Sequence, residues 1–171
     1  MIEKNGVMVP FPHETLVRII RLLADTPNPE VTSVLRSVAI GSDVEIRAEA
    51  IRAIGRLRDP EGISLLIYTL RKDDDPRVRA VSAEALGMFR TEAVLDPLVG
   101  ALKERHPMVR RAAAHALAKL GPLAEPCLQQ AVKQNRWALS LDRQRLAWEA
   151  RRLLRHTKNN GQAQSSAPWF Q

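Results

Sequence analysis

Hydrophobic residues recur along this chain at helical spacing. In the first segment, Leu16, Ile19 and Leu23 recur every three or four residues and form an apolar stripe that predicts a helix at about 13–25. The same spacing predicts eight further helices. They are expected at about 29–40, 43–57, 61–72, 75–89, 91–104, 106–120, 122–134 and 140–156. Proline, glycine and aspartate at the junctions mark helix ends and starts, so we expect an all-α chain of about nine helices.

Three of the expected helices share one pattern. Each begins at a candidate capping residue, and an arginine follows four positions later. The capping positions are Asp43, Asp75 and His106. The arginines are Arg47, Arg79 and Arg110. They are 32 and 31 residues apart, a period typical of stacked helical repeats. Mostly small residues follow each arginine, so neighbouring helices are expected to approach closely.

The run from Asp75 to Gly87 reads Asp-Pro-Arg-Val-Arg-Ala-Val-Ser-Ala-Glu-Ala-Leu-Gly. It resembles the HEAT-like repeat of the phycobilisome-lyase type, Asp-x-x-Val-Arg-x-x-Ala-x-x-Ala-Leu-Gly followed by a second apolar helix. The resemblance covers about residues 29–156. It implies a right-handed α-solenoid of stacked antiparallel helix pairs over 13–156, with an extended arm at 1–12 and a polar tail at 157–171. Such repeats serve as protein-binding scaffolds, lyase subunits and a few nucleic-acid enzymes.

Composition and charge narrow the class of protein. The chain has 171 residues, 45% of them hydrophobic, which is enough for one elongated core. The single cysteine, Cys127, excludes an internal disulfide framework. Because there is neither a long apolar run nor a secretory signal, we expect a soluble cytoplasmic protein without a membrane span.

The net charge of +7 is unevenly distributed. Residues 1–102 contain 13 basic and 15 acidic side chains, whereas residues 103–171 contain 13 basic and 4 acidic ones. This asymmetry predicts an acidic partner for the C-terminal end.

Repetition of the arginines in every unit favours a structural role. We expect a ladder of charge-assisted hydrogen bonds along the stack, in which arginines and neighbouring aspartates link the repeats. The ladder residues are Asp43, Arg47, Asp75, Arg79 and Arg110. His106 replaces the expected aspartate in the third unit, which weakens the cap there.

Counting from each arginine by the helical period gives the positions expected on the concave face. They are Arg52, Arg56, Val81, Glu84, Met88, Arg111, His115, Lys119, Arg145, Trp148 and Arg152. Trp148 stands among cations, a composition suited to carboxylates, phosphates or planar groups. A solvated helix face with one incidental tryptophan is the alternative. Trp169 and Phe170 end the tail, where they either dock into a partner or fold back onto this groove.

Catalytic chemistry finds little support in the sequence. The four histidines show no metal-ligand spacing with one another or with Cys127, which is expected to be a buried thiol. His13-Glu14 is a single pair, whereas helical-repeat iron hydroxylases use several. We therefore expect no catalytic residue, metal or cofactor, and we leave enzymatic activity open.

Three functions remain. The favoured one is a non-catalytic scaffold or assembly factor that holds another protein on the concave face, around Val81 and Met88. The family resemblance implies the second, a bilin lyase-like subunit that acts on phycobiliproteins. In that case Arg111, His115 and Arg152 hold propionates. The third is nucleic-acid binding through the basic C-terminal half.

Overall fold

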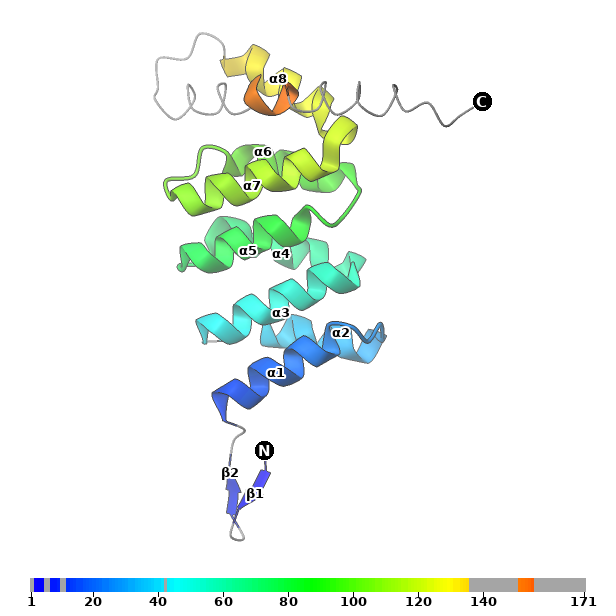
Figure 1. Cartoon of the computed structure of the whole chain (residues 1–171), viewed down its shortest axis with the longest axis vertical. Coiled ribbons are helices and arrows are strands. Elements are labelled where there is room, and N and C mark those ends of the chain that lie inside the picture. Colours follow the sequence, from blue (N-terminus) through cyan, green and yellow to red (C-terminus); the bar gives the residue numbers. More distant parts are fainter. Residues whose placement is uncertain (1, 5–6, 10–11, 42, 136–150, 156–171) are drawn as a thin grey trace, which may run out of the picture.

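The computed structural model describes residues 2–4, 7–9, 12–41, 43–135 and 151–155. Its main elements are α1 (His13–Leu23), α2 (Pro29–Val38), α3 (Val44–Leu57), α4 (Ile63–Lys72), α5 (Pro76–Leu86), α6 (Leu95–Ala101), α7 (Pro107–Leu120) and α8 (Glu125–Asn135). In Figure 1, α1, α3, α5 and α7 form one column, and α2, α4 and α6 lie behind it. The predicted helical solenoid is confirmed. No helix in the described part of the chain combines the length and apolar content that a bilayer crossing requires.

The helices begin where the sequence supplies caps. The side chain of Asn28 accepts a hydrogen bond from the Glu30 backbone N–H at 2.7 Å at the start of α2. Asp43 and Asp75 do the same for α3 and α5. Proline occupies the first turn of α2, α5 and α7, where its missing N–H costs nothing. His106 precedes α7 but makes no capping hydrogen bond with its side chain.

We call α3, α5 and α7, which follow the repeat pattern, the signature helices. They contact one another along the stack more extensively than the even-numbered helices do. Glycine makes this possible: a Cβ added to Gly55 would lie 2.8 Å from the Cβ of Ala85. At Gly87 the same atom would lie 2.7 Å from the Cβ of Ala116. The signature helices are therefore more closely spaced along the stack than the helices behind them.

One continuous apolar core runs through the stack. It includes Leu35, Ile54, Leu86 and Leu117, all fully buried. Short 3-10 turns at Pro60–Gly62, Glu92–Val94 and Gly121–Ala124 lead into α4, α6 and α8. Because such a turn occupies Glu92–Val94, α6 is shorter than the helix expected at 91–104.

Both ends of the stack carry further elements. At the N-terminal end, β1 (Ile2–Lys4) pairs antiparallel with β2 (Val7–Val9), with Ile2 opposite Val9. This hairpin lies within the segment expected to be an extended arm, and it adds the two strands to the helical fold (Figure 1). Residues 151–155 are helical, and Leu153 is buried in the core. The rest of the helix expected at 140–156 lies outside the described residues.

Candidate functional site

The repeat arginines join successive units. The Nη1 atom of Arg47 donates to the Gly41 carbonyl at 3.0 Å. Arg79 and Arg110 donate in the same way to carbonyls six residues upstream, at Asp73 and Glu104. Each arginine thus ties its own helix to the loop that precedes it, where carbonyl groups have no intrahelical partners.

The acids of this ladder differ from those expected. Arg47 forms a two-pronged pair with Asp73 of the following unit, at 3.1 and 3.0 Å. Arg79 reaches Glu104 of the unit after it at 3.4 Å. Asp43 and Asp75, which the sequence placed in the ladder, are instead helix caps whose side chains bond to His13 and Arg77 respectively. The acid that pairs with the preceding repeat lies six positions before a repeat arginine, as Asp73 and Glu104 do. The sequence analysis had instead placed it four positions before the arginine.

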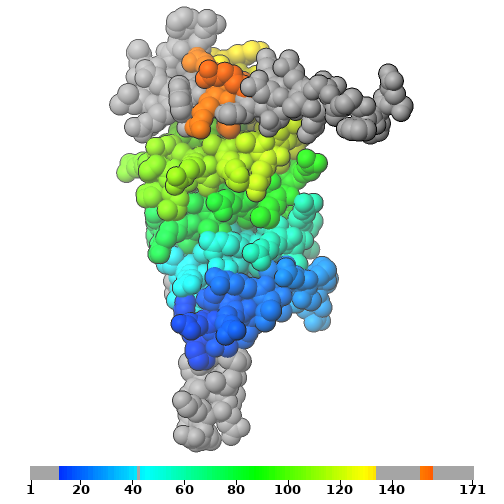
Figure 2. All heavy atoms as spheres, in the orientation of Figure 1, coloured from blue at the N-terminus to red at the C-terminus, as the bar shows by residue number. Residues whose placement is uncertain are grey.

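We call the exposed side of α1, α3, α5 and α7 the signature face; it points toward the viewer in Figure 2. Several predicted partner-binding residues lie on it with exposed or half-exposed side chains. They are Arg52, Arg56, Glu84, Met88, Arg111, His115 and Lys119. Val81 is a correction: only 6% of it is exposed, and it belongs to the core. It lies two residues after the repeat arginine, at the margin between α5 and its neighbours, so it is unavailable to a partner.

Two predicted residues meet in a shallow hollow of about 520 Å³. We call it the Met88 hollow; it is lined by Ala24, Asp25, Arg56, Leu57, Arg58 and Met88. Arg56 lies in the last turn of α3, Met88 lies two residues after the end of α5, and Ala24 and Asp25 directly follow α1. The hollow therefore combines an apolar floor with cationic edges.

A buried carboxylate, Glu49, lies on α3 about two turns before Arg56. Glu49 accepts hydrogen bonds at Oε1 from Nη2 of Arg21 at 2.9 Å and from Nη1 of Arg52 at 2.7 Å. Its side chain is only 8% exposed, whereas those of Arg21 and Arg52 are 55% and 43% exposed. The hydrogen bond from Arg21 lowers the pKa of Glu49 below its ordinary value, against the effect of burial. We call these three residues the arginine cluster.

The sequence analysis missed Arg21 as a site residue. A signal was present, because Glu49 is a charged residue two positions after a repeat arginine. The equivalent residues of the next two units are apolar and buried, Val81 and Ala112. A charge at a buried position requires a partner, and that partner comes from α1, which the repeat pattern does not include.

The other end of the signature face is cationic. Arg111, His115 and Lys119 are exposed on α7, and Arg151, Arg152 and Arg155 are exposed in the helical segment 151–155. The predicted site residues Arg145, Trp148, Trp169 and Phe170 lie outside the described residues.

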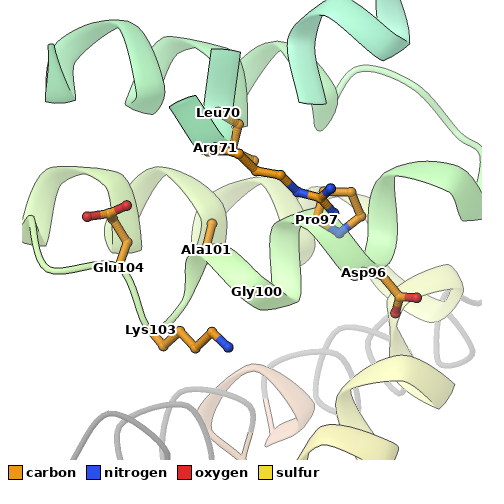
Figure 3. A pocket seen from close by; sticks show the side chains of 8 residues that line it. All are labelled: Leu70, Arg71, Asp96, Pro97, Gly100, Ala101, Lys103 and Glu104. Carbon is orange, nitrogen blue, oxygen red and sulfur yellow. The ribbon is translucent and has the colours of Figure 1, made fainter. Parts of the chain in front are cut away.

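A second hollow, of about 370 Å³, lies between α4 and α6, away from the signature face. Arg71, Asp96 and Lys103 border it, and Leu70 and Gly100 line it (Figure 3). Asp96 accepts a hydrogen bond from the Cys127 thiol at 3.2 Å. Burial, with Asp96 beside it, raises the pKa of Cys127 to about 11, which keeps it a neutral thiol. No group of three or more His, Cys, Asp or Glu side chains in the described ranges is placed to hold a metal ion.

The chain is similar in sequence to a known family of repeat proteins. Residues 12–86 and 63–140 match the family of HEAT repeats, and the repeat recognised in the sequence is thereby confirmed. A stretch of 75 residues, 44% of this chain, is 33% identical to the bilin biosynthesis protein PecE of Mastigocladus laminosus. That stretch covers 28% of PecE, so the chain spans only part of this relative.

Two solved structures match this chain. An engineered protein superposes with a TM-score of 0.55 and 22% identity, over 84% of this chain and 67% of its own. A chain from the complex of CpcE and CpcF of phycocyanin lyase from Nostoc sp. gives a TM-score of 0.49 and 17% identity, over 81% of this chain and 99% of its own.

Proposed function

Since the chain belongs to the HEAT-repeat family, we propose that it is a bilin-handling subunit that holds a phycobiliprotein or its bilin on the signature face. The similarity to the bilin biosynthesis protein PecE carries this proposal. A solenoid suits the task because it presents an extended surface of non-repeating side chains on a rigid frame. The role is to hold and orient the chromophore or its carrier while the bilin is attached, detached or isomerised.

The chemistry of the signature face supports this role. A bilin is a linear tetrapyrrole with an extended apolar body and two propionate groups. The face offers an apolar hollow at Met88 and guanidinium groups at Arg52, Arg56 and Arg111. Guanidinium groups bind carboxylates in a two-pronged geometry and also stack on planar π systems.

The first test mixes the purified protein with phycocyanobilin and records the visible absorption spectrum. A bound bilin is expected to become more extended and rigid, so its long-wavelength band should shift or strengthen. A second arm measures capture of an apo-phycobiliprotein subunit in a pull-down. The proposal is wrong if neither the spectrum nor the capture differs from that of an unrelated HEAT-repeat protein.

A matched pair of variants tests where on the signature face the ligand binds. Met88→Glu puts a negative charge in the Met88 hollow and is expected to weaken bilin or phycobiliprotein binding by about tenfold or more. Met108→Glu makes the same change on α7 at a side chain that is also partly exposed. It should leave binding in the Met88 hollow unchanged. Equal effects of the two substitutions would contradict this location.

A second candidate function is a protein scaffold that handles no chromophore. The cationic end of the signature face, at Arg111 and Lys119, favours an acidic protein surface as the partner. In this case the pull-down succeeds with an acidic partner while the bilin spectrum stays unchanged. Nucleic acid is distinguished by steep salt dependence of binding to any DNA or RNA.

A further inference from the structure

The arginine cluster and the Met88 hollow are neighbours on the signature face. Arg21 lies in the last turn of α1, three and four residues before Ala24 and Asp25, which follow the helix and line the hollow. Arg52 precedes Arg56, another lining residue, by one turn of α3. One turn of helix advances about 5 Å, so cations and hollow fall within the length of one small molecule or side chain.

Glu49 holds the cluster in place. Its carboxylate uses one oxygen, Oε1, to accept from both guanidinium groups, which come from different helices. It thereby fixes two long arginine side chains whose loss of rotamer freedom would otherwise oppose ligand binding. Each arginine donates one N–H to Glu49. Among the residues that the structure describes, no other accepts a hydrogen bond from either guanidinium group. The remaining donors are available at the half-exposed surface.

The local charge favours an anion. The cluster and hollow together contain Arg21, Arg52, Arg56 and Arg58 against the acids Glu49 and Asp25. Glu45, one turn before Glu49 on α3, is also near enough to raise the pKa of Arg21. One positive charge therefore remains in excess beside the apolar side chains of Leu57 and Met88. A carboxylate is the anion that two fixed planar guanidinium groups match best in a two-pronged geometry.

We propose that the arginine cluster and the Met88 hollow form one binding site for an amphipathic carboxylic acid. The carboxylate binds Arg21 and Arg52, and the apolar body lies in the hollow against Leu57 and Met88. This inference deepens the proposed function and rests on it for the identity of the natural ligand. It assigns the carboxylate to the α1–α3 end of the face, not to the cationic end at Arg111 and His115, where the sequence placed the propionates.

The site is tested without a bilin by two fluorescent probes. Pyrenebutyrate has a carboxylate on an apolar body, and pyrenebutanol has the same body without charge. Fluorescence titration is expected to show pyrenebutyrate binding about tenfold or more tightly, because two charge-assisted contacts form only with the acid. Equal affinities for the two probes would overturn the proposal.

Substitutions then assign the carboxylate. Arg52→Gln should weaken pyrenebutyrate binding about tenfold and leave pyrenebutanol binding unchanged. Glu49 keeps its bond from Arg21 in this variant, so the fold is retained, and the helical circular dichroism melt verifies it. Arg105→Gln removes the same charge from an exposed side chain outside the site and serves as the control. Equal weakening by Arg52→Gln and Arg105→Gln would reduce the site to general electrostatic attraction and overturn the assignment.

A bilin arm separates this inference from the proposed function. Phycocyanobilin is compared with its dimethyl ester, which keeps the tetrapyrrole and loses both carboxylates. If wild type binds the acid and the ester equally, the proposed function survives and the carboxylate site fails. If pyrenebutyrate binds as expected and phycocyanobilin does not, the site stands and the bilin assignment fails.

Discussion

The two ion pairs of the arginine ladder, Arg47–Asp73 and Arg79–Glu104, differ by one methylene group in the acid, and this difference predicts a stability change. Asp73 and Glu104 occupy equivalent positions, each six residues before a repeat arginine. Asp73 binds Arg47 through two hydrogen bonds, at Nε and Nη2. Glu104 binds Arg79 through one long contact of 3.4 Å, and the Nε atom of Arg79 is buried without a partner. We predict that Glu104→Asp stabilises the protein.

The magnitude follows from the groups involved. A hydrogen bond to a charged group contributes about 1.5–3 kcal/mol, and a buried donor without a partner costs about 1–3 kcal/mol. The side chains of Arg79 and Glu104 are 16% and 25% exposed, so solvent screening reduces the gain. The aspartate also releases contacts that Glu104 makes with the backbone N–H groups of Arg105 and His106. A net gain of about 1 kcal/mol is expected, or a melting temperature higher by roughly 2–4 °C.

The assay is urea denaturation followed by circular dichroism at neutral pH. The reciprocal variant, Asp73→Glu, serves as the control and should lower the free energy of unfolding by about 1–2 kcal/mol. Arg79→Lys should abolish the gain from Glu104→Asp, since an ammonium group cannot form the two-pronged pair. The reasoning fails if Glu104→Asp is destabilising while Asp73→Glu is neutral.

Three further predictions use other features of the stack. Gly87→Ala should destabilise by about 1–3 kcal/mol because its Cβ would collide with the next signature helix, whereas Gly100→Ala, whose Cβ meets open space, should gain up to about 1 kcal/mol in thermal melts. The pKa of Asp75 is lowered from 3.8 to about 2, chiefly by the hydrogen bond from the Arg77 side chain. Its contribution to stability is therefore complete above pH 4 and is lost as the pH falls to 2. Asp75→Asn should accordingly reduce the loss of unfolding free energy between pH 4 and pH 2 in an acid denaturation series. Alkylation of Cys127 by iodoacetamide at pH 8 should be slow and should accelerate in Asp96→Asn, which lowers the pKa of the thiol; an unchanged rate would refute the Asp96 contact.

The helical fold could be predicted from the sequence because the capping and spacing patterns that indicate it are local and repeated. Each capping aspartate and first-turn proline acts on its own helix, and the arginine period sets the stacking. The two-stranded hairpin was beyond this reasoning, since three-residue strands carry too short an alternation to be distinguished from an extended arm.

Only part of the candidate site could be predicted from the sequence, and the reason is physical. Counting along one helix identifies outward positions such as Arg52 and His115, but it does not show how far a neighbouring helix covers them. Val81 is buried for this reason, although Glu84, one turn further on, is exposed. Arg21 was missed because contacts between α1 and α3 join residues 28 apart that share no repeat pattern.

The glycine contacts between signature helices also set a mechanical limit. At Gly55 and Gly87 the backbones of successive signature helices are already in contact, so these helices cannot move closer together. Flexing can therefore spread the binding surface open, but it cannot draw the units closer together. The stack can therefore accommodate a larger ligand by moving its helices apart, but it cannot close around a ligand that is too small.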